Sequence, residues 1–168
     1  MKSPRSCKNC HKPLPSVADY CPHCGSLNAE GRKCVKHPRT DATGVCIICS
    51  LPYCGKCATR VNKLFLCARH DEYEIFEGMA RVYGVSDTAN AQFVVRCLKQ
   101  AGFHPFLFSR KASPISIGGP DYTLFRASGE YNGHIINEEK VMVPCAEVIE
   151  AEKVLKTLSV KSKKSPTK

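Results

Sequence analysis

Residues 34–70 read CVKHPRTDATGVCIICSLPYCGKCATRVNKLFLCARH, and their cysteines and histidines decide the fold. Cysteine and histidine stand here in short pairs with two residues inside each pair. The pairs are Cys34/His37, Cys46/Cys49, Cys54/Cys57 and Cys67/His70. Two intervening residues let one tight turn direct both side chains at a single tetrahedral metal. Since two pairs complete a shell of four ligands, this stretch predicts two zinc sites.

Two more pairs, Cys7/Cys10 and Cys21/Cys24, lie in CKNCHKPLPSVADYCPHCG at residues 7–25. Together the pairs predict three zinc ions per chain with no ligand left over. A disulfide framework is the alternative, and it requires an oxidising compartment. The start of the chain, MKSPRSCKNCHKPLP, has no apolar segment typical of a signal peptide. No stretch approaches the roughly 18 apolar residues of a membrane span. We therefore expect a cytoplasmic protein whose thiols are available for metal.

Composition indicates that the metal is a condition of folding in the first part of the chain. Residues 1–70 contain few aliphatic side chains and no tryptophan. Domains below about 40 residues usually need a metal or disulfides to fold. A structural zinc contributes about 10–16 kcal/mol in small finger peptides, so it can supply what the apolar core lacks.

Charge is distributed unevenly along the chain. The formal net charge is +10, with the excess of Lys and Arg in residues 1–70 and in the tail 161–168, whereas residues 71–160 are mildly acidic. Ten thiolates and three Zn²⁺ ions would lower the net charge to about +6. A basic zinc module can bind the phosphates of a nucleic acid, but lysines of this kind are more often solvated side chains at the protein surface. We expect weak nucleic-acid binding at most.

The two cysteine-rich stretches resemble known zinc modules. Residues 7–25, with the knuckle from Cys21 to Gly25, resemble the short bacterial zinc ribbon. Residues 34–70, with His-Pro after the first cysteine and a closing Cys-x2-His, resemble the B-box type zinc finger, in a Cys-rich form that looks prokaryotic. That resemblance implies a cross-brace: one site of Cys34, His37, Cys54 and Cys57, and another of Cys46, Cys49, Cys67 and His70. Spacing alone also permits sequential pairing. The packed face is predicted from Val45, Ile47, Ile48, Leu51, Leu64, Phe65 and Leu66.

After Glu72 the pattern changes to ordinary strand and helix periodicity. We expect strands at 81–85, 104–108, 122–125, 133–136 and 141–143. One helix is capped by Asp87, stops at Gly102 and has Phe93, Val94, Cys97, Leu98 and Ala101 on its apolar face. A second starts at Pro144 and runs to about Leu158, with Val148, Ile149, Ala151, Val154, Leu155 and Leu158 apolar. The order favours a ferredoxin-like α+β sandwich.

This region is also similar to the prokaryotic signal-transducing protein family. The likeness rests on Ser86-Asp87-x-x-x-Ala91, on Leu98-x-x-Ala101-Gly102-Phe103 and on Val141-x-Val143-Pro144. It covers roughly residues 79–158 and implies a fold rather than a mechanism. The predicted organisation is therefore a zinc ribbon at 1–28, a B-box-like finger at 32–72, an α+β domain at 78–160 and a basic disordered tail at 161–168.

A nucleophile with a base is not apparent in the sequence. Cys97 falls on an apolar helix face and is expected to be a small core residue, and a redox role is the functional alternative for Cys145 at a helix start. His104 and His134 stand alone in strand-like segments, and His11 and His23 are expected to be exposed beside the knuckles. The turn at 118–120 lacks the GxxxxGK[ST] of a phosphate loop. A catalytic zinc keeps an open position, whereas these predicted shells are full.

The sequence therefore favours a non-enzymatic zinc-binding adaptor or regulatory protein that binds another protein, and signalling is the expected setting. Two alternatives stay open. One is a nucleic-acid-binding zinc-finger protein that uses the basic fingers and tail. The other is a metabolite-sensing regulator whose pocket lies in the C-terminal domain.

Overall fold

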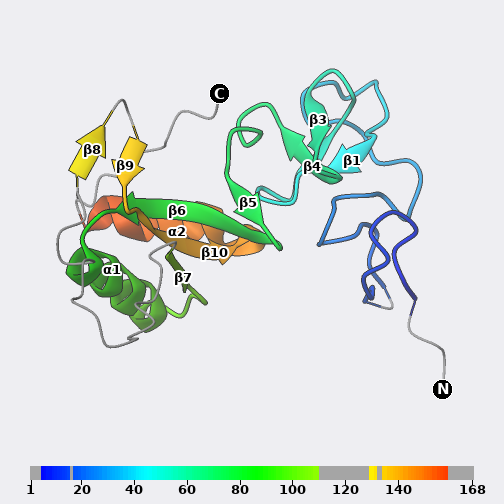
Figure 1. Ribbon diagram of the computed structural model, residues 1–168. Helices are drawn as coiled ribbons and strands as arrows, with labels where there is room; N and C mark the ends of the chain where they lie inside the picture. The colour runs from blue at the N-terminus through cyan, green and yellow to red at the C-terminus, as the bar shows by residue number, and fades with distance from the viewer. Residues whose placement is uncertain (1–4, 16, 110–128, 132–133, 159–168) are drawn as a thin grey trace. The chain divides into compact units, whose positions relative to one another are not determined.

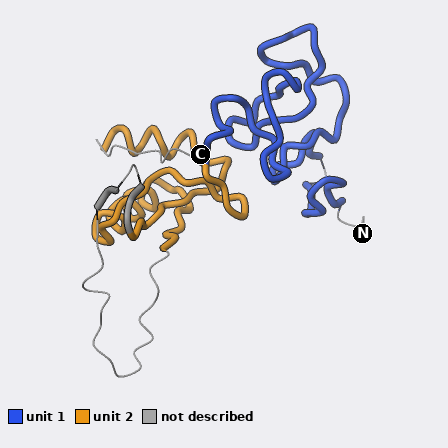
Figure 2. Tube along the Cα trace, turned by 45° about the horizontal axis from the view of Figure 1, so that its top comes forward, with its two compact units in different colours: residues 1–73 blue, residues 74–168 orange. Residues whose placement is uncertain are grey.

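The computed structural model describes residues 5–15, 17–109, 129–131 and 134–158 of the chain. The chain divides into two compact units, Met1–Tyr73 and Glu74–Lys168, which Figure 2 draws in blue and orange. The first unit holds all of the paired cysteines and histidines, and the second holds the helices.

The first unit has little regular structure, because its cysteine turns occupy most of the chain. Two short antiparallel hairpins are present (Figure 1): β1 (Gly44–Val45) pairs with β2 (Pro52–Tyr53), and β3 (Ala58–Val61) pairs with β4 (Leu64–Cys67). Isolated bridges join Ser6 to Pro13 and Tyr20 to Leu27 within residues 5–28. From their resemblance to zinc modules, we use the label ribbon for residues 5–28 and the label finger for residues 32–72. The segments around each cysteine pair are thus brought together in hairpins, as knuckle-type metal sites require.

The apolar core of the first unit is small and lies between the hairpins. Five of the predicted packing residues are buried, namely Val45, Ile47, Ile48, Phe65 and Leu66. The prediction for Leu51 is wrong, since 42% of it is exposed. Ser50, which precedes it, has φ of 56°, and this left-handed turn is followed by an exposed Leu51. Tyr53, which the sequence pattern did not single out, is buried instead.

The zinc-ribbon segment and the finger segment are joined by backbone hydrogen bonds. The amide of Val45 donates to the carbonyl oxygen of Gly25 at 2.8 Å, and the amide of Phe65 donates to that of Cys24 at 3.0 Å. Arg60 donates to the Ser26 hydroxyl at 3.2 Å. The knuckle of the ribbon therefore lies against β1 and β4 of the finger. The assignment of residues 1–28 and 32–72 as separate domains stays a prediction.

The second unit is built on a curled, four-stranded antiparallel sheet with the order β5-β6-β10-β7. Two helices accompany it, and a separate hairpin precedes β10 (Figure 1). The elements are β5 (Ile75–Phe76), β6 (Met79–Val85), α1 (Thr88–Gln100), β7 (Phe106–Ser109), β8 (Gly129–Tyr131), β9 (His134–Ile136), β10 (Glu139–Pro144), the 3₁₀ turn η2 (Cys145–Glu147) and α2 (Val148–Thr157). The predicted strand at 122–125 lies outside the described residues.

Helix α1 begins and ends as the sequence predicts. The Asp87 side chain accepts a hydrogen bond from the Ala89 amide at 2.9 Å, which caps the first turn. Gly102 follows the helix with φ of 87°, a conformation that favours glycine. The buried stripe consists of Ala91, Val94 and Leu98. Phe93 was predicted on this face, but 48% of it is exposed, because it lies one position away from the stripe.

The start of the last helix differs from the prediction. Pro144 is the final residue of β10 rather than the first of a helix, and η2 separates it from α2. Helix α2 buries Val148, Ala151 and Leu155. Leu158, predicted on the apolar face, follows the helix as its cap and is 39% exposed. The cause is that the helix ends at Thr157, so the buried stripe stops at Leu155.

Strand alternation gives the sheet two different faces. Ala80 and Val82 of β6, with Val141 and Val143 of β10, are fully or almost fully buried on one face. Both helices contact β6 and β10 and also each other, so they cover this face together. The opposite face carries Arg81, Lys140 and Met142, together with aromatic residues of the edge strands.

Candidate metal centres

The first Cys group lies in the ribbon and consists of Cys7, Cys10, Cys21 and Cys24. The sulfurs of Cys7 and Cys24 are 3.6 Å apart, as are those of Cys10 and Cys21. Each pair is held by a turn that begins at its first cysteine. The amide of His11 donates to the carbonyl oxygen of Cys7 at 2.9 Å, and that of Gly25 donates to that of Cys21 at 2.8 Å. Two knuckles thus present four sulfurs to one point.

The second group consists of Cys34, His37, Cys54 and Cys57. The Nδ1 atom of His37 faces the three sulfurs, at 3.9 Å from Cys34, 3.4 Å from Cys54 and 3.2 Å from Cys57. All three cysteines are buried, whereas His37 is exposed. The imidazole therefore closes the site on its solvent side.

The third group consists of Cys46, Cys49, Cys67 and His70. Here the Nδ1 atom of His70 lies 3.5 Å from the sulfur of Cys46 and 3.2 Å from that of Cys67. The Tyr73 ring packs edge-on against the imidazole with the centroids 5.7 Å apart. The Tyr53 hydroxyl lies 3.8 Å from the sulfur of Cys49. These aromatic neighbours fix the orientation of two ligands, a role that ligand spacing does not reveal.

The geometry of these groups fits tetrahedral zinc. With Zn–S near 2.3 Å and Zn–N near 2.0–2.1 Å, a tetrahedral ion separates its ligands by about 3.8 Å for two sulfurs and about 3.6 Å for sulfur and nitrogen. The observed separations of 3.2–3.9 Å lie around these values. Within each group, all four donor atoms lie within 4.8 Å of one another. All twelve cysteines of the chain are free, so no disulfide competes for these sulfurs.

The second and third groups interleave along the chain. The Cys34/His37 pair is grouped with Cys54/Cys57, and the Cys46/Cys49 pair is grouped with Cys67/His70. This grouping is the one that the cross-brace implies, and it differs from sequential pairing. The hairpin of β3 and β4 lies between Cys57 and Cys67 in the chain and pairs Ala58 with Cys67, while the two cysteines belong to different groups. Each finger site therefore joins two pairs that are separated along the chain by a pair of the other site.

Each group contains one thiol that ionises readily. Burial raises the pKa of Cys24, but hydrogen bonds with the Ser26 and Asn9 side chains outweigh it and lower the pKa to about 6. Burial likewise opposes the backbone hydrogen bonds around Cys34, which lower its pKa to about 6. The contact with Cys46 lowers the pKa of Cys49 to about 7. A thiolate is the metal ligand, so each group offers a first anchor near neutral pH.

Other thiols in the same groups keep their protons in the absence of metal. The contact with Cys49, followed by burial, raises the pKa of Cys46 to about 12, and burial raises that of Cys21 to about 12. Burial also raises the pKa of Cys57 to about 11. Metal binding to such thiols releases protons, so the affinity of each group rises with pH.

The remaining predicted candidates are not members of the three Cys/His groups. Cys145 is buried at the start of η2, and Cys97 is half-buried on α1. His104 is exposed, and its Nδ1 atom lies 2.7 Å from Glu147 in a surface pair. His11 and His23 are exposed, as expected. His134 falls in β9, and the turn at 118–120 lies outside the described residues.

Part of the basic surface is already neutralised by acidic neighbours. Arg32 pairs with Asp19 and Lys33 pairs with Asp41, each at 2.7 Å. Arg32 also lies over the ring of Tyr20, with its guanidinium carbon 5.8 Å from the centroid. The two cations between the ribbon and the finger therefore tie surface segments of the first unit together and are less available to phosphate.

Comparison of the chain with protein-family models, with curated proteins and with solved structures finds no match. Among the residues that the structure describes, none of the helices is both long enough and apolar enough to cross a bilayer. The function must therefore be argued from the three Cys/His groups and from the surfaces of the two units.

Proposed function

We propose that the three Cys/His groups hold three structural zinc ions and that the chain is a non-enzymatic adaptor that binds another protein. The observation that carries the proposal is the closure of the groups. Each already brings four soft or imidazole donors within 4.8 Å of one another, which is the full complement of a structural site. A hydrolytic zinc needs a position for water, and these donor sets leave none.

Exposed apolar side chains on the finger support a protein partner. Val35 is 49% exposed and Leu51 is 42% exposed. The amide of Val35 donates to the carbonyl oxygen of Pro52 at 3.0 Å, which places Val35 beside the segment that carries Leu51. Val35 directly follows Cys34, and Leu51 lies two residues after Cys49, so both are close in sequence to proposed metal ligands. Bound metal ions would hold this surface rigid, so little conformational entropy would be lost when its apolar side chains contact a partner.

The test is capture of a partner by the zinc-loaded full chain, with matched variants. Val35→Ser with Leu51→Ser should reduce capture at least about fivefold, because the contact would lose its apolar centre. Val61→Ser, which alters a comparably exposed valine on β3, should leave capture unchanged. Equal capture by both variants would contradict this docking surface, and hydrolysis of a substrate by the zinc-loaded chain would contradict the adaptor role.

Nucleic-acid binding is the second candidate, and it is favoured by exposed cations on the finger. Lys36 and Arg39 flank His37, and neither has an ion-pair partner among the described residues. A mobility-shift titration at physiological salt decides between the two roles. Sub-micromolar binding that disappears without the zinc unit would favour nucleic acid. Weak binding with a steep salt dependence would be the response of any cationic surface to a polyanion.

For the second unit, we propose a ferredoxin-like α+β domain that binds a ligand or transmits a signal. The proposal is supported by the chain order β6, α1, β7, β10 and α2, from which β5, the β8–β9 hairpin and η2 are left out, and by two helices that cover the same face of an antiparallel sheet. If this unit senses a small molecule, its melting temperature should rise with the ligand concentration while the zinc unit is unaffected.

A further inference from the structure

The sheet of the second unit has an aromatic hollow on the face away from its helices. The hollow has a volume of about 410 Å³, and its apolar lining consists of Phe76, Phe106, Phe108, Met79 and Met142. Strand register explains this gathering. Phe76 of β5 pairs with Met79 of β6, and Phe106 of β7 pairs with Met142 of β10. Cross-strand partners project from the same face, so both edges of the sheet supply rings to one place.

The rings of the hollow are open to a ligand. Phe76 is 59% exposed and Phe106 is 58% exposed. The centroids of Phe76 and Phe108 lie 6.1 Å apart with 47° between the ring planes, so the two rings are tilted rather than stacked. Aromatic faces carry negative potential, and several of them around one space attract a cation.

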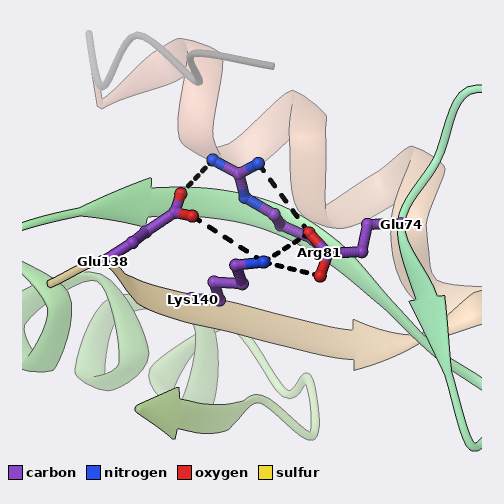
Figure 3. A network of polar contacts seen from close by, with 4 residues as sticks. All are labelled: Glu74, Arg81, Glu138 and Lys140. Carbon is purple, nitrogen blue, oxygen red and sulfur yellow. Dashed lines mark hydrogen bonds and ion pairs between the residues drawn. The ribbon is translucent and has the colours of Figure 1, made fainter. Parts of the chain in front are cut away.

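Lys140, which lines the hollow, is already paired with carboxylates (Figure 3). The Nζ atom of Lys140 lies 2.6 Å and 2.7 Å from the two carboxylate oxygens of Glu74, and 3.8 Å from Glu138. Arg81 pairs with Glu138 and lies 4.0 Å from Glu74. Burial raises the pKa of Glu138, and Arg81 and Lys140 oppose that rise. An anionic ligand would therefore have to displace a carboxylate from each cation.

A further carboxylate stands at the same hollow without such a partner. Glu77 lines it and has no ion pair or hydrogen bond among the described residues. Its place is fixed by the tight turn between β5 and β6, where Glu77 has φ of 49° and Gly78 has φ of 86°. With Lys140 already neutralised by Glu74, the free charge at the hollow is negative.

We propose that this hollow binds an organic cation with a methylated ammonium group. The rings of Phe76, Phe106 and Phe108 would surround the methyl groups, and Glu77 would balance the charge. A nucleic-acid strand would also stack on rings, but it would bring phosphates to a surface whose free charge is negative. The inference does not rest on the role proposed for the zinc unit, because the lining belongs entirely to the second unit.

The test uses the zinc-loaded full chain and two probes of the same shape. Choline carries the ammonium charge, and 3,3-dimethylbutan-1-ol is its neutral isostere. The chain has three methionines, of which Met79 and Met142 line the hollow, so methyl-labelled methionine reports binding directly by NMR. We expect saturable choline shifts at these two methyls with a dissociation constant of about 1 mM or tighter. The isostere should bind at least about tenfold more weakly.

Matched variants locate the site. Phe106→Leu should weaken choline binding about tenfold, whereas Phe93→Leu, at an exposed phenylalanine of α1, should not change it. Glu77→Gln should weaken binding about two- to fivefold, and Glu30→Gln in the first unit should not. These substitutions lie at exposed positions, and an unchanged circular dichroism spectrum and melting temperature without ligand verify the fold.

Three results would overturn the proposal. The first is equal binding of choline and the isostere, which would make the hollow merely apolar. The second is the absence of shifts at Met79 and Met142 at saturating choline. The third is self-association that Phe106→Leu abolishes, because a second copy would then cover the rings. None of these results bears on zinc content, so failure here is distinct from failure of the adaptor role.

Discussion

The backbone amide of Phe65 donates a hydrogen bond to the carbonyl oxygen of Cys24 at 3.0 Å. Cys24 belongs to the first Cys/His group, whereas Phe65 lies on β4, two residues before Cys67 of the third group. The first and third metal groups are thus linked through one strand. The neighbouring bond from Val45 to Gly25 strengthens the link, since it joins β1 to the same knuckle.

The first prediction concerns Gly25, which has φ of 75° at this junction. A Cβ there would overlap the carbonyl of Val45 and lie 2.7 Å from the Cβ of Phe65. Gly25→Ala should therefore separate the ribbon from the finger and destabilise the first unit by about 1–3 kcal/mol. Hydrogen exchange at the amides of Val45 and Phe65 should accelerate. Gly31→Ala is the matched control, because Gly31 has φ of 86° but open space around it. Equal effects of both variants would show that backbone strain alone is responsible.

The second prediction concerns removal of metal. Chelation should unfold residues 1–73 and leave 74–158 folded, because the first unit has a small apolar core whereas the second buries two helices against a sheet. Hydrogen exchange after chelation should show lost protection in the first unit only. Loss of protection in both units would mean that they fold as one.

The third prediction concerns ligand pairing in the finger. Cys34→Ser and Cys57→Ser should each lose the same metal ion, because both sulfurs face His37. Cys49→Ser should lose the other finger site, and the ribbon site should be retained in all three variants. Cadmium bound in place of zinc gives each site a separate NMR signal. Identical behaviour of Cys34→Ser and Cys49→Ser would contradict the cross-brace and support sequential pairing.

The fourth prediction concerns Gly84 on β6. A Cβ at this position would overlap the Glu138 carboxylate and the Arg81 guanidinium, so Gly84 makes room for their ion pair. Gly84→Ala should destabilise the second unit by about 1–3 kcal/mol, as measured by denaturant unfolding. In a background with Arg81→Ala and Glu138→Ala, the same change should cost much less. Additive costs would mean that Gly84 acts independently of the pair.

The pairs of metal ligands could be predicted from the sequence, because a two-residue spacing restricts where both side chains can point. The cap at Asp87 could be predicted for the same local reason. The contact between ribbon and finger could not be predicted, because it is made by backbone hydrogen bonds from Val45 to Gly25 and from Phe65 to Cys24. A pattern of side chains in the sequence does not reveal such bonds. Whether each phenylalanine is buried or exposed could not be predicted from the sequence either. Phe93 resembles a core residue by spacing but is exposed, and the hollow of Phe76 and Phe106 arises only when distant strands pair.

The metal content of the natively folded chain tests the central claim most directly. Protein made in zinc-supplied cells and kept reduced should be weighed intact by native mass spectrometry, with its zinc measured by elemental analysis. Three Cys/His groups of four donors predict three zinc ions per chain and all twelve cysteines without disulfides. One zinc ion or fewer per chain, with intramolecular disulfides among residues 7–70, would contradict the account.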